Sequence, residues 1–158
     1  MVKITIYGLP GTGKGEVSKL LAKKLNYEHL SAGDMMRKNA TDLGITLAEL
    51  KEKRMTDPIF DHKLDEFSAE FGRSHDDFIF ESRLPWYFIP DSFKIKLTGD
   101  LEVRMKRVAS RDGISLEEAN DIESRREKTD GELYKDLYGI EDTNADEHFD
   151  FNAVKILV

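Results

Sequence analysis

The sequence predicts an α/β fold in which helices cover both faces of a central parallel sheet. Short apolar segments with strand periodicity alternate with amphipathic helical segments along the 158 residues, as expected for parallel strands joined by crossover helices. A glycine-rich turn also joins the first expected strand directly to the first expected helix. The length, and the lack of repeats, low-complexity runs and linkers, fit a single domain over residues 1–158.

The first half of the chain begins with a strand and a helix. Alternating apolar residues predict a strand over Val2–Tyr7. Four apolar residues at helical spacing predict an amphipathic helix over Glu16–Lys24: Val17, Leu20, Leu21 and Leu25. The segments that follow are a short strand over Tyr27–Leu30, a helix from Asp34, and a helix after the capping box of Thr46 and Glu49.

The second half continues the alternation. A four-residue apolar stripe predicts a further helix: Phe60, Leu64, Phe67 and Phe71. Buried strands are expected over Phe78–Phe80 and Phe93–Leu97, and then a helix with the stripe Leu101, Met105, Val108 and Ala109. Ser115 and Glu118 form a second capping box, and Phe149–Phe151 is expected as the last strand.

The composition excludes several classes of protein. Without cysteine, the chain forms no disulfide and no thiolate metal site. No segment approaches the roughly 20 apolar residues of a membrane span, and Met1–Tyr7 lacks the pattern of a signal peptide, so we expect no membrane partner and a cytoplasmic location. A net charge of −7 argues against nucleic-acid binding. We leave the oligomeric state open, with a monomer as the expectation.

The segment Gly8–Lys14 has the spacing of a phosphate-binding loop. It reads G-x-x-x-x-G-K and lies between a strand and a helix, the context that this motif requires. Glycines let main-chain N–H groups face phosphate oxygens, while the helix N-terminus and Lys14 add positive charge. The alternative is a glycine-rich turn without a ligand. The residues expected to bind a nucleoside triphosphate are Gly8, Gly11, Thr12, Gly13, Lys14, Gly15 and Glu16.

Gly15 and Glu16 depart from the general motif. A Ser or Thr that touches Mg²⁺ usually follows the lysine, whereas this chain has Gly15. A glutamate in the first helical turn is favoured by the helix dipole, but the charge of Glu16 would repel a triphosphate. This position leaves open whether catalytic activity is complete.

An ordered series of motifs follows the loop: SAGDMMR at 31–37, GITLAEL at 44–50, the segment 57–65, FESRL at 80–84, LEVRMKRVASR at 101–111 and YKDLYGI at 134–140. Their order and nearly unbroken spacing resemble the archaeal-type cytidylate kinases, P-loop nucleoside-monophosphate kinases related to adenylate kinases. The similarity runs from Val2 to about Asn152. Adenylate kinases carry G-K-G-T in their loop, so Gly15 has a counterpart there, while Glu16 replaces the threonine.

The resemblance implies a three-layer P-loop kinase fold with monophosphate-binding helices within residues 31–75 and a short helical lid within residues 104–130. It implies transfer of the γ-phosphoryl group of ATP, with Mg²⁺, to CMP or dCMP. The residues then expected in catalysis are Lys14, Arg107 and Arg126, with Arg104 and Arg111 as further ATP ligands and Glu81 orienting Mg²⁺ through its waters. The expected acceptor ligands are Ser31, Gly33, Arg37, Asp61, Asp65 and Arg83. For Arg37 and Arg83, a surface ion pair is the alternative interpretation.

Helix geometry also supports an arginine-lined lid. At 100° per residue, Arg104, Arg107 and Arg111 lie within about 60° of one another. Three cations on one face repel unless an anion or an acidic partner meets them. Arg126, on the next helix, shares an inward stripe with apolar residues. The alternative is a solvated face on which these arginines pair with Glu117, Glu118 and Glu123.

Several positions differ from the resembled family and leave the acceptor open. The segment 66–68 replaces an Arg-Arg-Gln run, Ser82 replaces a glycine, and Leu133 replaces a lid arginine. Asp61 and Asp65, one turn apart, would accept a hydrogen bond from a cytosine amino group or only solvate their helix. The alternatives are therefore the same chemistry on AMP, UMP or another acceptor, and a nucleotide-binding module with little turnover. Residues 152–158 are too few for the family's final helix, so we expect at most a strand extension there.

Overall fold

The computed structural model of the chain describes residues 2–57, 59–142 and 153–157. Five strands form one sheet in the order β2-β3-β1-β4-β5, and all four pairings are parallel. The strands are β1 (Lys3–Tyr7), β2 (Glu28–Ser31), β3 (Phe78–Ser82), β4 (Phe93–Thr98) and β5 (Ala153–Leu157). The predicted α/β class with a central parallel sheet is therefore confirmed. The expected strand Phe149–Phe151 lies outside the described residues, and the structure places β5 immediately after that segment.

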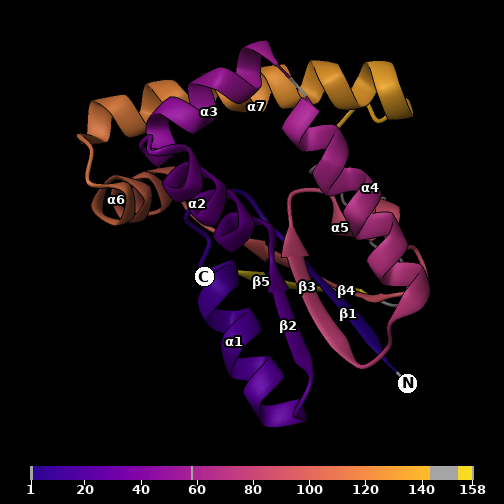
Figure 1. Cartoon of the computed structure of the whole chain (residues 1–158). Coiled ribbons are helices and arrows are strands. Elements are labelled where there is room, and N and C mark those ends of the chain that lie inside the picture. The colour runs from indigo at the N-terminus through magenta and orange to yellow at the C-terminus, as the bar shows by residue number, and fades with distance from the viewer. Residues whose placement is uncertain (1, 58, 143–152, 158) are drawn as a thin grey trace.

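Seven helices accompany this sheet in the described residues: α1 (Lys14–Leu25), α2 (Ala32–Leu43), α3 (Leu47–Thr56), α4 (Ile59–Ser74), α5 (Pro85–Phe88), α6 (Leu101–Asp112) and α7 (Leu116–Tyr138). Both predicted capping boxes are present, at the start of α3 and of α7. The short helix α5 is missing from the sequence prediction. Figure 1 shows α7 crossing above the sheet, with α3 and α6 packed against it. Among the described residues, no helix combines the length and the apolar character that a membrane span needs.

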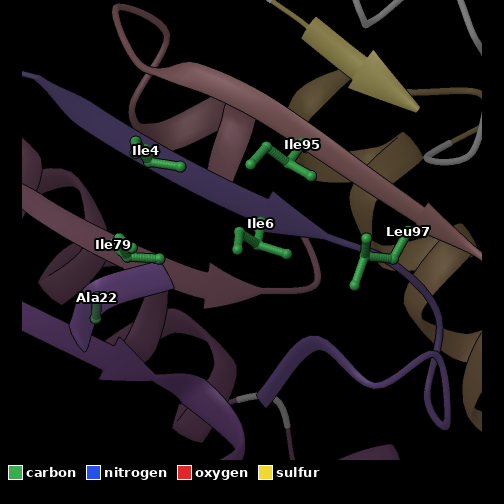
Figure 2. Packing of buried hydrophobic residues seen from close by; sticks show 6 residues of the cluster. All are labelled: Ile4, Ile6, Ala22, Ile79, Ile95 and Leu97. Atoms are coloured by element: carbon green, nitrogen blue, oxygen red, sulfur yellow. The ribbon is translucent and has the colours of Figure 1, made fainter. Parts of the chain in front are cut away.

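The core beneath α1 consists of apolar residues from the central strands of the sheet. Ile4 of β1 pairs in register with Ile79 of β3, and Ile6 of β1 pairs with Ile95 of β4. All four side chains are buried. Figure 2 shows these side chains together with Ala22 of α1. Apolar residues that face helices on both sides of a sheet form the near-continuous runs that the sequence displays.

Part of the stripe predicted for α1 is wrong. Leu20 is 63% exposed and Leu25 is 42% exposed, whereas the fully buried positions are Ser18 and Ala22. These small residues face the sheet because α1 begins directly at the turn after β1 and packs closely against its neighbour β3. Hydrophobic spacing located the helix but gave the wrong face for two of the four apolar residues of the stripe.

The stripe predicted for α4 is also only partly right. Phe71 is buried and packs edge-on against Phe78, with ring centroids 4.9 Å apart. Phe67 is 40% exposed, while Asp61 and Ser68 are buried. The reason is that one side of α4 lines a polar cavity rather than the apolar core, so polar residues are enclosed there.

The connection order of the sheet sets the position of the site. β1 is central, and the chain continues from it to β2 and β3 on one side and to β4 and β5 on the other. In open parallel sheets, ligands bind beyond the carboxyl ends of the strands where the order reverses in this way. The glycine-rich loop follows β1 at that point.

Candidate functional site

A cavity of about 370 Å³ lies beyond the carboxyl ends of the strands. Its walls come from the glycine-rich loop, α2, α3, α4, the end of β3, α6 and α7. Nine lining residues are Lys or Arg and five are Asp or Glu, although the chain as a whole carries a net charge of −7. Cationic side chains concentrated in one enclosed space favour an anionic ligand.

The glycine-rich loop has the conformation that its glycines permit. Gly11 and Gly13 both have positive φ, 82° and 83°, and Gly13 is the N-cap of α1. A Cβ on Gly11 would lie 2.3 Å from the carbonyl oxygen of Arg104, so the loop packs directly against the backbone of α6. Main-chain N–H groups at a helix N-terminus are a general anion-binding arrangement.

Lys14 and Thr12 hold this loop in shape. The Lys14 ammonium donates to the carbonyl oxygens of Gly8 at 2.6 Å and Leu9 at 3.2 Å, and the Thr12 hydroxyl donates to Leu9 at 2.8 Å. Thr12 is buried, and neither it nor Gly8 lines the cavity, whereas Gly11, Gly13 and Lys14 do. Thr12 and Gly8 therefore shape the loop, and the others face the cavity.

The charge of Lys14 is sensitive to its surroundings. Burial lowers the pKa of its ammonium to about 8, and Arg83, Arg111 and Arg126 act in the same direction, while Glu81 opposes them. A lysine among arginines is stabilised in its charged form when an anion is added. Burial is thus the main reason that the charged form of Lys14 is disfavoured, and the nearby arginines add to it.

Glu81 and Glu16 lie near the start of α1. Glu81, at the end of β3 and in register with Ile6, is buried. Its Oε1 lies 3.5 Å from where a Cβ on Gly15 would be, so the carboxylate faces the position that carries Ser or Thr in other phosphate loops. Glu16 is exposed, and it lines the same cavity as Glu81 and Gly15.

The start of α2 forms another wall of the cavity. Ser31 is the N-cap of α2 and accepts from the Asp34 N–H at 3.1 Å; it does not line the cavity, whereas Gly33 and Arg37 do. Arg37 is half-exposed and forms an ion pair with Asp34 one turn earlier. Gly33 leaves room for the Arg37 guanidinium, which lies 3.4 Å from the position that a Cβ on Gly33 would occupy.

Asp61 has a cationic partner that the sequence did not indicate. Arg54 of α3 forms an ion pair with Asp61, and its Nη1 contacts the Met36 sulfur at 2.7 Å. Both charged side chains are buried. Burial, together with Arg126, lowers the pKa of Arg54 to about 10, although Asp130 acts in the opposite direction. Asp61 is thus a buried, paired carboxylate rather than one that solvates its helix.

Asp65 lies one turn further along α4 and contacts α7. Its Oδ2 accepts from the Tyr138 hydroxyl at 2.8 Å. Burial raises the pKa of Asp65 to about 6, and the hydrogen bond from Tyr138 only partly offsets this effect. Asp61 and Asp65 both line the cavity, as the sequence placed them.

The three arginines of α6 do not share one environment. Arg107 donates to the carbonyl oxygen of Gly11 at 3.1 Å, and Arg111 forms two hydrogen bonds with Asp112 at 2.6 and 3.0 Å; both line the cavity. Arg104 is buried, donates to the Pro10 carbonyl at 3.3 Å and lines a separate cavity between α6 and α7. The expected single stripe is therefore divided, because α6 packs tightly on the loop.

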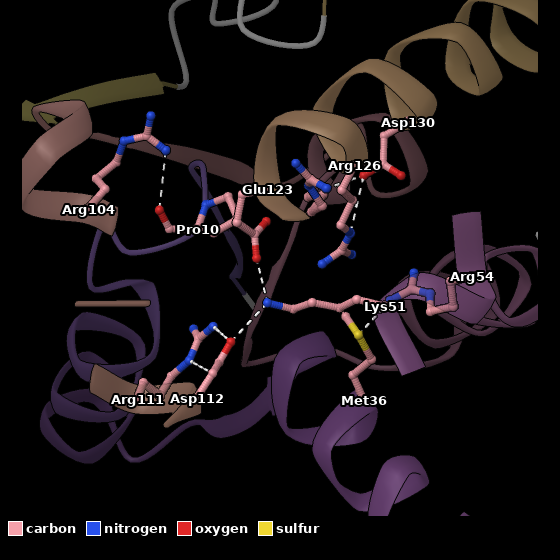
Figure 3. A network of polar contacts seen from close by, with 11 residues as sticks. Pro10, Met36, Lys51, Arg54, Arg104, Arg111, Asp112, Glu123, Arg126 and Asp130 are labelled. Atoms are coloured by element: carbon pink, nitrogen blue, oxygen red, sulfur yellow. Dashed lines mark hydrogen bonds and ion pairs between the residues drawn. The ribbon is translucent and has the colours of Figure 1, made fainter. Parts of the chain in front are cut away.

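Two of the three glutamates proposed as alternative partners for these arginines, Glu118 and Glu123, form hydrogen bonds with other residues. Glu118 closes the capping box with Ser115. Glu123 accepts from Lys51 at 2.5 Å, and Lys51 also donates to Asp112 at 2.9 Å (Figure 3). These three side chains are at most 5% exposed. Lys51 is absent from the sequence-based site, although it links α3 to both helices of the expected lid.

Asp130 is a second residue that sequence reasoning missed. Its Oδ2 forms an ion pair with Arg83, at the end of β3, and lies 3.7 Å from Nε of Arg126 on α7. Arg83 and Arg126 line the cavity with Lys14. The spacing of four residues between Arg126 and Asp130 was the available signal, because such pairs meet on one helix face. The contact with Arg83, 47 residues away, had no local signal.

A phosphate-binding loop at the switch point of a parallel sheet, beside a cation-lined cavity, defines a P-loop kinase. Solved structures of similar fold include a shikimate kinase from Acinetobacter baumannii in complex with shikimate, with a TM-score of 0.61, 20% identity and coverage of 86% of this chain and 79% of that one. An uncharacterized protein from Eubacterium ventriosum aligns with a TM-score of 0.63 and 20% identity, covering 99% and 89% of the two chains. These likenesses concern the fold alone.

The chain belongs to the cytidylate kinase-like family, whose model matches residues 3–152. A cytidylate kinase from Methanococcoides burtonii is 36% identical over 138 residues, covering 87% of this chain and 79% of the relative. One from Ignicoccus hospitalis is 38% identical over 143 residues, covering 89% and 83%. The sequence-based assignment to this family is confirmed.

Proposed function

We propose that this protein is a cytidylate kinase that transfers the γ-phosphoryl group of ATP to CMP or dCMP. The observation that carries this proposal is that one cavity joins the phosphate loop to Arg37, Asp65 and Arg83, in a chain that belongs to the cytidylate kinase-like family. Both substrates of a phosphoryl transfer need to be enclosed together, because the transferred group must lie in line between them.

The donor end of the cavity supplies fixed positive charge. In this proposal, the main-chain amides of Gly11–Gly15 and the Lys14 ammonium hold the β- and γ-phosphates. Arg107, Arg111 and Arg126 add charge from the lid side, where negative charge spreads over the equatorial oxygens in the transition state. The lowered pKa of Lys14 supports this role, since a bound polyphosphate would offset the burial and the arginine charges that disfavour its charged form.

Glu81 supports the use of Mg²⁺ with ATP. It is a buried carboxylate beside the first turn of α1, and Gly15 leaves space next to it. Oxygen ligands and retained waters suit Mg²⁺, so Glu81 would hold the ion through its waters. When bound, the ion would neutralise charge on the donor's phosphates.

The acceptor end combines cations with carboxylates. We propose that Arg37 and Arg83 bind the acceptor's phosphate, since each guanidinium offers a planar pair of donors, while Ser31 and Gly33 fix the start of α2 beside it. Asp61 is already paired with Arg54, so it would act by holding that arginine in place. Asp65 is then the carboxylate of α4 that is better placed to accept from the base's amino group.

The test is an acceptor panel. Purified protein is incubated with Mg·ATP and, separately, CMP, dCMP, UMP, AMP and GMP, and ADP release is measured. Turnover with CMP and dCMP alone supports the proposal. Turnover mainly with another monophosphate refutes the assigned acceptor, and ATP binding without turnover on any acceptor refutes the catalytic assignment.

A further inference from the structure

Asp130 forms ion pairs with two arginines that line the cavity, Arg83 and Arg126. One carboxylate oxygen, Oδ2, contacts Arg83 and approaches Arg126, and Figure 3 shows Arg126 beside Asp130 on α7. The Arg83, Arg126 and Asp130 side chains are 18%, 7% and 14% exposed. Solvent therefore screens this cluster only weakly.

The neighbouring carboxylates are engaged by other cations. Asp61 forms its ion pair with Arg54, and Glu123 forms its ion pair with Lys51. Among the described residues, Asp130 is the acidic partner in the ion pairs of both Arg83 and Arg126. Asp130 is thus the carboxylate in direct ion-pair contact with both arginines, and Glu123 adds a more distant negative charge.

The electrostatic effects within the cluster agree with its geometry. Burial, and then the charge of Arg83, lower the pKa of Arg126, against the effect of Asp130. Burial is the largest effect on Arg83 and opposes its charged form, but Asp130, together with Tyr134, Glu123 and Tyr7, outweighs burial, so the pKa of Arg83 is raised. Each arginine therefore destabilises the charge of the other, and the carboxylate offsets this repulsion.

We infer that Asp130 is the resident counter-ion of the acceptor-phosphate site. It balances Arg83 and Arg126 while the site holds no phosphate, and the phosphate of the acceptor competes with it for Arg83. A single shared oxygen leaves further N–H groups on both guanidiniums, and a phosphate dianion offers more charge and more acceptor atoms than a carboxylate. The inference rests on the proposed function, because it takes this end of the cavity as the acceptor-phosphate site.

The first test compares the affinity of three proteins for inorganic phosphate by calorimetry without nucleotide: wild type, Asp130→Asn and Asp136→Asn. Asp136 is exposed on the same helix, and its replacement by Asn removes the same charge as the Asp130 variant does. We expect Asp130→Asn to lower the Kd for phosphate about tenfold, because a unit charge a few ångströms away exerts at least that effect at a moderate effective dielectric constant. Asp136→Asn should leave the Kd unchanged. Equal or weaker phosphate binding by Asp130→Asn overturns the inference.

A second comparison locates the effect, because phosphate also binds to phosphate loops. The gain from Asp130→Asn should disappear in an Arg83→Gln background if the two groups compete at one site. If the gain persists at full size without Arg83, the phosphate binds elsewhere and the inference fails. A structural role alone would lower the melting temperature of Asp130→Asn without tightening phosphate binding.

A double variant tests the inference even if Asp130→Asn alone does not fold. Arg126→Gln with Asp130→Asn removes one charge of each sign, so the repulsion between the arginines is absent. This double variant should bind phosphate more tightly than Arg126→Gln alone, and equal or weaker binding overturns the inference. CMP turnover is measured separately: its absence in the wild type refutes the proposed function, whereas the phosphate titrations still decide the role of Asp130.

Discussion

Replacement of Lys51 by methionine tests the buried ionic triad that joins α3 to α6 and α7. The Lys51 ammonium lies 2.9 Å from Asp112 and 2.5 Å from Glu123, and all three side chains are at most 5% exposed. Unit charges about 3 Å apart attract by roughly 5 kcal/mol at an effective dielectric constant of about 20, and desolvation offsets part of this energy. Removing one partner of a buried pair typically costs about 3–5 kcal/mol, and we expect Lys51→Met to lower the free energy of unfolding by a similar amount.

Urea denaturation at pH 7 measures this loss, with Lys106→Met as the control. Lys106 pairs with Glu102 one turn away on α6, but these side chains are 61% and 70% exposed, so little stability should depend on the pair. If Lys51→Met is as stable as Lys106→Met, the reasoning from burial is refuted. A neutral triad, with Asp112→Asn and Glu123→Gln added to Lys51→Met, should recover much of the loss because no buried charge is left unpaired.

The triad also predicts a dependence of stability on pH. Burial would raise the pKa of Glu123, but Lys51 and Arg126 outweigh it, so the pKa lies below its usual value. The pKa of Asp112 is likewise lowered, since Arg111 and Lys51 outweigh burial. Because both values are lower in the folded state, the stabilisation is present above the unfolded pKa values of about 4 and is lost as pH falls through the lowered ones. Urea denaturation between about pH 5 and pH 3 should show this loss in wild type and a smaller one in the neutral triad.

Three further predictions concern the phosphate loop. The pKa of Lys14 is about 8 in the free protein, and its charged form binds phosphate, so the ATP affinity measured by calorimetry should fall above about pH 8. Lys14→Met should bind ATP far more weakly, and its affinity should not change with pH in this range. An equally steep pH dependence in that variant would contradict the role of Lys14. Glu16→Thr should tighten ATP binding in the same assay by removing a like charge, and weaker binding would show that Glu16 contributes to the site. Gly11→Ala should lower thermal stability and ATP affinity more than Gly13→Ala: both glycines have positive φ, but only the Gly11 Cβ would meet the Arg104 carbonyl, at 2.3 Å, whereas the Gly13 Cβ meets nothing within 4 Å. Equal effects would mean that the loop moves away from α6 at no cost.

Short-range patterns predicted most of the elements. Capping boxes, alternation and glycine spacing act through neighbours within a few residues, and both capping boxes are formed as predicted. The same patterns were less able to define which face of a helix is buried. Leu20 and Phe67 fit their predicted stripes yet are exposed, because the buried face depends on what the rest of the chain places against the helix.

The candidate site also combines residues that the sequence predicted with residues that only the tertiary structure revealed. Lys14 and Arg83 were predicted from motifs and Arg126 from helical spacing, and all three line one cavity. Lys51 and Asp130 carry no motif, and their partners lie 47 to 72 residues away. A long-range ion pair leaves no periodic trace in the sequence, so neither the contacts of Lys51 with α6 and α7 nor the contact of Asp130 with Arg83 could be assigned in advance.

The sequence by itself determined the glycine-rich loop, most of the strands and helices, and the family. Those features depend on local backbone preferences, and a strand, a glycine turn and a helix in succession fix the geometry of the loop. Only the tertiary structure decided how the charges pair, for instance Asp61 with Arg54 and Asp130 with Arg83. Charges interact through space, more strongly when they are closer together and more deeply buried, and only folding brings residues that are distant in the sequence close enough to pair.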